Sequence, residues 1–256
     1  MDIYEAIILG IIQGITEWLP ISSSGQGMLT MLMFFGVSAK EAFSIAIYLH
    51  FGTLLAVLVY LRQEIIDIFK VENKKILQFL IISTIFTGLV GLPLYKFLSD
   101  AFGEFSGGIF TILIGILLII TGIILHQSKE TSKEARDIEL KDMVLAGCAQ
   151  GITILPGISR SGITVAALLW LKFNQQTALK LSFLMSIPAV LGALAIESLN
   201  STITPFSQEV AAGIIFAFIF GILTMHLLLK IAQKLNFANF CIFLGGVSAV
   251  LGYLLL

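Results

Sequence analysis

The chain has 256 residues, of which 57% are hydrophobic and 12% are charged, and its formal net charge at pH 7 is −1. A soluble domain carries about twice that share of charged residues, and the mean hydropathy of +1.00 indicates an integral membrane protein. Helices are the expected spanning elements because they satisfy their own backbone hydrogen bonds. The sequence has no basic stripe that could follow a phosphate backbone, so nucleic acid is not expected as a partner.

The first apolar stretch, residues 3–33, is interrupted by Pro20 and a serine cluster. Its halves are about a dozen residues long, whereas a membrane span needs about 20. The stretch therefore predicts a re-entrant helical hairpin whose break is buried in protein or lines a wet cavity. Residues 143–171 are interrupted in the same way at Pro156 and Gly157, and they predict a second hairpin.

Three uninterrupted apolar stretches follow each hairpin, and each is long enough to cross a bilayer. These six predicted spans are 41–61, 76–98, 107–126, 177–198, 208–230 and 237–256. The expected fold class is all-α: a polytopic membrane protein with six transmembrane helices and two re-entrant helical hairpins. Because three is odd, the second half enters the membrane in the opposite orientation, which is the inverted-repeat arrangement.

The repeat predicts a single membrane domain, 1–256, with halves at about 1–126 and 141–256. A charged cytoplasmic linker, interpreted as a solvated segment, joins them over about 127–140.

Basic residues lie mainly on one side of this topology. If the loop at 62–75 is cytoplasmic, only Lys40 and Lys96 fall on the opposite side. The cytoplasmic side then carries Arg62, Lys70, Lys74, Lys75, Lys129, Lys133, Arg136, Lys141, Lys172, Lys180, Lys230 and Lys234. This bias follows the positive-inside rule. We therefore expect a multi-pass protein of the plasma membrane with both termini outside.

The two hairpins share a phrase. Residues 13–25 read QGITEWLPISSSG and residues 150–162 read QGITILPGISRSG, at an offset of 137 (150 minus 13), with eight of thirteen positions identical. The first copy carries an acid, Glu17, and the second a base, Arg160. A charge at the centre of a membrane helix costs about 2.5–3.5 kcal/mol, so both residues are functional candidates. Together they predict one composite site.

Arg160 follows the break of the second hairpin, and Ser159 is a suitable N-cap for the helix after it. A guanidinium beside free N–H groups at a helix start is an anion site, suited to phosphate. Glu17 could act as a general base or hold a divalent cation, and the nearby serines are candidate nucleophiles. The alternative is that Arg160 and Glu17 pair only to stabilise the fold.

Two other polar residues fall within predicted spans. His50 either hydrogen-bonds a neighbouring helix or faces the cavity and assists proton transfer. Glu197 lies near the outer end of its span and is interpreted as an interfacial acid.

The phrases QGITEWLPISSSGQ and LPGISRSGIT resemble the two signature motifs of the undecaprenyl-diphosphate phosphatase family, membrane enzymes associated with bacitracin resistance. The second motif is matched in full by Pro156, Gly157, Ser159, Arg160, Ser161 and Thr164. The resemblance implies hydrolysis of a long-chain polyprenyl diphosphate to the monophosphate and inorganic phosphate, which recycles a lipid carrier for surface glycans. It also implies a divalent cation, Mg²⁺ or Ca²⁺, and a site reached from the outer face.

The family's acidic motif corresponds to Gln13 and Glu17 here. Many bacterial members follow the serine turn with Gly-His, whereas this chain has Gly25 and Gln26. The Gln variant resembles archaeal-type members, for which the carrier would be a dolichyl-like lipid. Since Gln cannot act as nucleophile or base, either Ser23 or a water activated by Glu17 must attack.

The resemblance thus assigns catalysis to Glu17, Ser23 and Arg160, with Glu17 also the candidate metal ligand. Gln13 and His50 would support them. The expected phosphate-binding residues are Ser22, Ser24, Gly25, Gln26, Ser159, Ser161 and Thr164.

A second function class stays open. Inverted repeats with broken helices are also typical of secondary transporters, so the alternative is a transporter or flippase of a polyprenyl phosphate or related lipid anion. The expected partners are the lipid substrate and membrane lipids, and a homodimer is left open.

Overall fold

The computed structural model describes residues 1–68, 70, 74–101, 107–126, 133–200, 207–232 and 237–254. Over these residues the chain is helical, apart from loops and one isolated β-bridge between Lys133 and Phe173. The helices are α1 (Ile3–Thr16), α2 (Ser23–Phe34), α3 (Ala39–Tyr60), α4 (Arg62–Ile68), α5 (Lys74–Ala101), α6 (Gly107–His126), η2 (Ala135–Asp137), α7 (Leu140–Ile152), α8 (Arg160–Trp170), α9 (Gln175–Asn200), α10 (Gln208–Ala232) and α11 (Phe237–Leu254). The all-α prediction is confirmed.

The breaks predicted in the two apolar stretches are present, between α1 and α2 and between α7 and α8. Both second helices begin at a serine cap. Ser22 adopts a left-handed conformation (φ 59°), and its Oγ accepts a hydrogen bond from the Gly25 N–H at 3.2 Å. Ser159 accepts one from the Gly162 N–H, also at 3.2 Å. A serine cap at each start supplies an acceptor to an otherwise free N–H group.

Five of the predicted spans correspond to helices of the length and hydropathy needed to cross a membrane, namely α3, α5, α6, α9 and α10. The sixth predicted span corresponds to α11, which has 18 residues and is not among the helices that meet those criteria over the part of the chain described.

The helices pack in equivalent pairs. Helix α1 packs on α10 and α7 packs on α5, while α6 pairs with α11 and α3 contacts α9. Gly14 of α1 and Gly151 of α7 are related by the offset of 137. They let α1 pack closely on α10 and α7 pack closely on α5. A Cβ at Gly14 would lie 2.8 Å from the Ala217 carbonyl oxygen, and one at Gly151 would lie 2.9 Å from that of Thr87. Small residues let helix backbones approach in this way.

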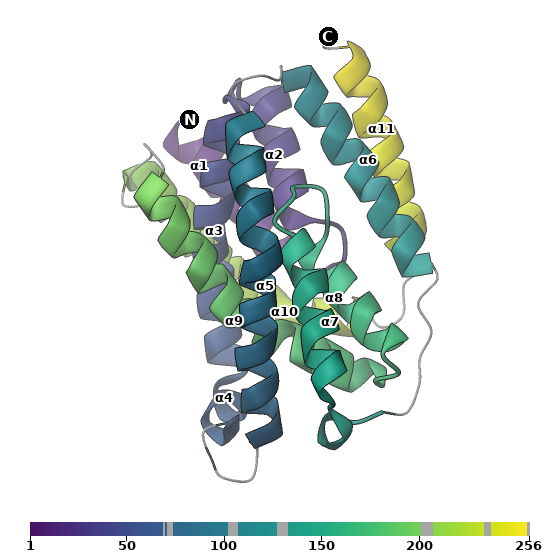
Figure 1. Cartoon of the computed structure of the whole chain (residues 1–256). Helices are drawn as coiled ribbons and strands as arrows, with labels where there is room; N and C mark the ends of the chain where they lie inside the picture. Colours follow the sequence, from purple (N-terminus) through teal and green to yellow (C-terminus); the bar gives the residue numbers. More distant parts are fainter. Residues whose placement is uncertain are drawn as a thin grey trace.

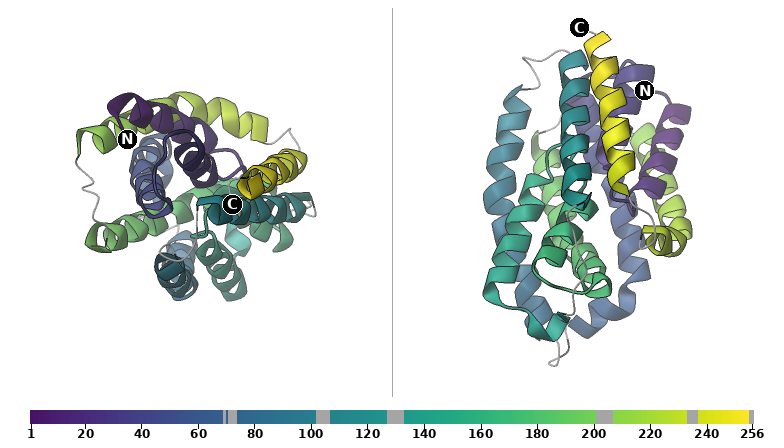
Figure 2. Two further views of the ribbon diagram at one scale, coloured as in Figure 1. Left: turned by 90° about the horizontal axis from the view of Figure 1, so that it is seen from above. Right: turned by 90° about the vertical axis from the view of Figure 1, so that its right-hand side faces the viewer.

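The two termini lie at one end of the molecule, and α4 lies at the other (Figure 1 and the right view of Figure 2). Helices α1 and α2 occupy the half nearer the termini, and α7 and α8 occupy the opposite half. The two hairpins therefore approach the middle of the molecule from opposite ends.

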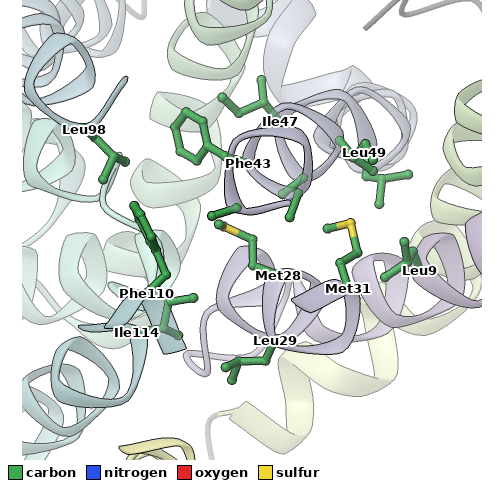
Figure 3. Close-up of a cluster of buried hydrophobic side chains, with 14 of the residues drawn as sticks. Leu9, Met28, Leu29, Met31, Phe43, Ile47, Leu49, Leu98, Phe110 and Ile114 are labelled. Carbon is green, nitrogen blue, oxygen red and sulfur yellow. The ribbon is translucent and has the colours of Figure 1, made fainter. Parts of the chain in front are cut away.

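A buried apolar cluster holds α2 in place. Met28 and Met31 project from α2 towards α3, which carries Phe43 and Leu49, and Phe110 of α6 closes the cluster (Figure 3). Helix α2 thus packs on α3 and α6.

The predicted linker is partly described, since residues 127–132 lie outside the described residues. From Lys133 onward the linker is anchored to the protein. The Lys133 N–H donates to the Lys172 carbonyl at 2.9 Å, and its Nζ lies 2.5 Å from the buried carboxylate of Asp142. The acids that follow, Glu134, Asp137 and Glu139, are exposed, so the linker is solvated there although Lys133 is anchored.

Candidate functional site

The breaks of the two hairpins cross each other near the middle of the molecule. Ser22 Oγ accepts a hydrogen bond from the Gly157 N–H at 3.2 Å, and Ser161 Oγ donates one to the Leu19 carbonyl at 3.2 Å. Each hairpin therefore bonds to the backbone of the other, and the serine-capped helix starts are fixed side by side.

Glu17 lies at this crossing, directly after α1, and only 5% of its surface is exposed. Its Oε1 accepts a hydrogen bond from Arg160 Nη2. Its Oε2 accepts hydrogen bonds from Ser23 Oγ at 2.5 Å and from Gln13 Nε2 at 3.0 Å. His50 Nε2 lies 3.4 Å from the same oxygen. The acid of one repeat and the base of the other thus form one cluster with a serine.

Arg160 is the first residue of α8, and its side chain is 15% exposed. One guanidinium nitrogen, Nη2, is paired with Glu17. The other, Nη1, is buried and has no hydrogen-bond partner among the described residues. Buried donors are normally paired, so a free guanidinium N–H indicates a site for an acceptor oxygen, such as one from a phosphate.

A cavity of about 210 Å³ adjoins this cluster. Its polar wall consists of residues from both hairpin breaks and α3: Glu17, Ser22, Ser23, Ser24, His50, Ser159, Arg160 and Ser161. Because α2 and α8 both begin at this wall, the positive ends of two helix dipoles face the cavity. The wall therefore favours an anion.

Four of the expected site residues do not line the cavity. Gln13 reaches it only through its hydrogen bond to Glu17. The Gly25 N–H donates to Ser22 Oγ, and the Gln26 amide donates to the Ile21 carbonyl at 3.1 Å. Thr164 lies behind Arg160, where its Oγ1 lies 2.6 Å from Ser182 Oγ. Direct contact of Gly25, Gln26 and Thr164 with phosphate stays a prediction, whereas Gln13 supports Glu17 as expected of it.

Of the two interpretations of His50, the structure favours the one that faces the cavity. Its Nδ1 lies 2.6 Å from the Ala46 carbonyl of its own helix, which orients the ring. The ring can therefore present Nε2 to Glu17.

Glu197 is not the interfacial acid that its position near a span end predicts. It is 3% exposed, and its carboxylate accepts hydrogen bonds from Ser44 Oγ at 2.5 Å and Tyr95 Oη at 2.8 Å. These donors come from α3 and α5, whose placement beside α9 the sequence pattern did not reveal. The buried carboxylate therefore connects three helices.

Gln150 is a cavity residue that the sequence analysis did not single out. It is the counterpart of Gln13 in the repeated phrase, so the signal was present. Its Nε2 donates to Thr87 Oγ1 at 3.1 Å and to the Met185 carbonyl at 3.3 Å. Its Oε1 is buried and has no partner among the residues described.

Few side chains of the cavity wall are suited to bind a metal ion. In the described part of the chain, no three His, Cys, Asp or Glu side chains gather as a metal cluster, and Glu17 is the one carboxylate in the cavity wall. Mg²⁺ is commonly bound by one or two carboxylates together with substrate phosphates. The residues fit a divalent cation in that form, with Glu17 as its protein ligand.

Comparison with known proteins shows the family of the chain. Residues 6–250 match the family of the bacitracin resistance protein BacA. A protein of Methanococcoides burtonii named undecaprenyl-diphosphatase is 45% identical, covering 99% of this chain and 100% of its own. Proteins of the same name from Methanothrix thermoacetophila and Methanopyrus kandleri are 44% and 38% identical, covering 98% and 97% of this chain and 97% and 95% of their own. These relatives are archaeal, as the resemblance to archaeal-type members predicts. The chain belongs to the bacitracin resistance protein BacA family.

Proposed function

We propose that this protein hydrolyses a long-chain polyprenyl diphosphate, of the undecaprenyl type, to the monophosphate and inorganic phosphate. The observation that carries the proposal is the meeting of Glu17, Ser23 and Arg160 at one cavity wall. A general base, a candidate nucleophile and an anion-binding cation are the groups that the reaction needs. The shared name of the relatives supports the same reaction and does not favour the transporter alternative. The product would return a lipid carrier to surface glycan synthesis.

In the proposed reaction, Ser23 Oγ attacks the terminal phosphorus and its proton passes to Glu17 Oε2, along the existing hydrogen bond of 2.5 Å. The bond from that phosphorus to the bridging oxygen breaks, and the monophosphate leaves with the electron pair and the proton from Glu17. A water deprotonated by Glu17 then cleaves the phosphoserine, which releases inorganic phosphate and returns a proton to Ser23. Direct attack by a water activated by Glu17 is the alternative, and it gives the same products.

Arg160 would bind the diphosphate while its ion pair with Glu17 stays in place. Its Nη2 stays on the carboxylate, while the unpartnered Nη1 donates to a phosphate oxygen. Hydrogen bonds between charged groups are shorter and stronger than neutral ones. The starts of α2 and α8 add their positive dipole ends to the same anion.

We extend the proposal to a divalent cation, Mg²⁺ or Ca²⁺, bound by the diphosphate and Glu17. When bound, the cation neutralises charge on the phosphate oxygens.

We also propose the topology of six spans and two re-entrant hairpins, as an inverted repeat of 1–126 and 141–256 within one membrane domain. The equivalent pairs α1–α10 and α7–α5 support it, as does the approach of the hairpins from opposite ends (Figure 1). The basic residues near α4 support a cytoplasmic position for that end. Both termini, at the other end, would then lie outside the plasma membrane.

The test is phosphate release by the purified full chain in detergent, with undecaprenyl diphosphate and either Mg²⁺ or Ca²⁺. We expect release above background in the wild type and loss of it in Arg160→Ala. Release no greater than background from a folded wild-type protein under both cations would overturn the proposed reaction.

A further inference from the structure

Two buried aromatic side chains lie beside the ion pair of the site. The guanidinium carbon of Arg160, Cζ, lies over the ring of Phe183, 6.0 Å from its centroid. Phe183 meets Trp18 edge to face, with the ring centroids 5.8 Å apart and the planes at 61°. The two residues are 2% and 1% exposed, and neither lines the cavity. They therefore do not touch an anion bound at the polar wall, and any effect on it passes through Arg160.

Trp18 is fixed from behind by α10. Its Nε1 donates a hydrogen bond to the Gly221 carbonyl at 3.1 Å. A Cβ at Gly221 would lie 3.3 Å from a carbon of the Trp18 ring, so the helix backbone and the indole are in close contact. A buried indole with its N–H paired is held in one orientation, and it fixes the edge of the Phe183 ring in turn.

Helix α9 also supports the main chain of Arg160. Thr164 Oγ1 donates to the Arg160 carbonyl at 2.7 Å and lies 2.6 Å from Ser182 Oγ. Ser182 directly precedes Phe183 on α9. Two adjacent residues of α9 therefore fix Arg160, one through Thr164 at its main chain and the other at its guanidinium.

The repeat shows that helix packing alone does not require this ring. At the offset of 137, Arg160 corresponds to Ser23 (160 minus 137) and Phe183 to Ala46 (183 minus 137). Helix α8 contacts α9 as α2 contacts α3, so the two places are equivalent in the fold. The half that has no arginine has a methyl group where the other half has an aromatic ring. The ring accompanies the cation.

The guanidinium needs a second contact to keep its direction. Its hydrogen bond to Glu17 fixes Nη2, but a single bond leaves the plane of the group free to turn about that contact. A guanidinium stacks on an aromatic face, and the attraction is stronger where both groups are buried. Contact with Phe183 therefore sets the plane, and with it the direction of the unpartnered Nη1.

We propose that Phe183 is a positioning residue for Arg160: its ring, held by Trp18, fixes the guanidinium so that Nη1 is directed at a phosphate oxygen of the substrate. The inference rests on the proposed function for the role of Arg160 in binding the diphosphate. It assigns a task in substrate binding to a side chain that lies outside the cavity lining.

The test weakens the ring face without changing its shape. Mono-, di- and trifluorinated phenylalanine at position 183 reduce the negative charge of the ring face in steps. The Kd for inorganic diphosphate, measured by calorimetry in detergent, should rise with each fluorine and reach at least about fivefold. KM for undecaprenyl diphosphate should rise in parallel, while kcat stays within about twofold because Glu17 and Ser23 are unaltered.

The same substitutions at Phe79 are the matched control. Phe79 of α5 is 0% exposed, and no cation lies over its ring within the described structure. Fluorination there should leave Kd and KM within about twofold of the wild type. Affinity that does not depend on the number of fluorines at position 183, or that changes equally at both positions, would show that Phe183 only fills space and would overturn the inference.

The binding measurement separates this inference from the proposed reaction, because it needs no hydrolysis. A wild type that binds diphosphate with the expected dependence on fluorine, but releases no phosphate, would refute the reaction and keep the positioning role. A wild type that binds no diphosphate would refute the anion site at Arg160, and the role of Phe183 with it.

Discussion

Ser23 Oγ donates a hydrogen bond of 2.5 Å to Glu17 Oε2 across the break of the first hairpin. The two residues are six positions apart, and the turn between α1 and α2 brings them together. A hydroxyl held on a carboxylate in this way has its proton already directed at a base. The first two predictions follow from this pair.

Glu17→Gln should lower kcat for phosphate release by about 10²–10⁴-fold, because Gln keeps the shape of the side chain but cannot accept a proton. The measurement is initial rate with undecaprenyl diphosphate, with Glu134→Gln as a control at an exposed acid in the linker. Equal rates in the two variants would remove the general-base role.

Ser23→Ala should lower kcat about 10³-fold if the serine is the nucleophile. Wild-type protein quenched during turnover of a substrate labelled in its terminal phosphate should then carry the label on Ser23. Ser198→Ala is the control, since Ser198 is an exposed residue of α9. An unlabelled protein together with a Ser23→Ala variant that retains most activity would indicate direct attack by water.

Arg160→Gln should lower both activity and stability, because it leaves the buried Glu17 carboxylate without its cation. Loss of one partner of a buried ion pair costs about 3–5 kcal/mol. The double variant Arg160→Gln with Glu17→Gln should recover much of the unfolding free energy and none of the activity. Thermal unfolding in detergent and phosphate release measure the two effects. Additive losses of stability in the double variant would show that the pair is not coupled.

Gly157→Ala should destabilise the second hairpin by about 1–3 kcal/mol. Gly157 has φ of +99°, which side-chain-bearing residues rarely adopt, and a Cβ there would lie 2.7 Å from the Ile114 carbonyl oxygen. Gly246→Ala, at an unstrained and open position, is the control in the same unfolding measurement. A Gly157→Ala protein as stable as the control would refute this account of the turn.

Tyr95→Phe should lower the unfolding free energy by about 1–3 kcal/mol, because it removes a side-chain hydrogen bond to the buried Glu197 carboxylate. Tyr4→Phe tests the loss of a hydroxyl at an exposed position, where 74% of the residue is accessible, and should change little. A similarly small effect in both variants would mean that the hydrogen bond from Tyr95 to Glu197 does not stabilise the fold.

The sequence predicts well what depends on periodicity and local signals. Breaks at Pro20 and Pro156 were evident because they leave halves too short to span a membrane, and Ser22 and Ser159 cap the helices that follow. The meeting of Glu17 and Arg160 in one site followed from the repeat and the cost of burying charge. These inferences need no knowledge of which helices are neighbours.

What depends on helix neighbours was not predicted. Glu197 was interpreted as interfacial because the sequence shows that it lies near a span end. The sequence does not show that hydrogen-bond donors on α3 and α5 lie beside it. Gln26 looked like a site residue because it follows the serine turn, but its amide bonds back to Ile21. Gln150 was overlooked although it is the counterpart of Gln13 in the repeat, because the second copy carries no acid four residues after it.

The crossing of the hairpins also governs when the site can exist during synthesis. The hydrogen bond between Ser22 and Gly157 joins residues 135 positions apart, and Leu19 accepts its hydrogen bond from Ser161. Neither bond can form until the second hairpin has been synthesised. The first half alone cannot form these two hydrogen bonds, so the reactive cluster requires residues of both halves. Coexpressed polypeptides 1–126 and 133–256 should therefore gain activity only together.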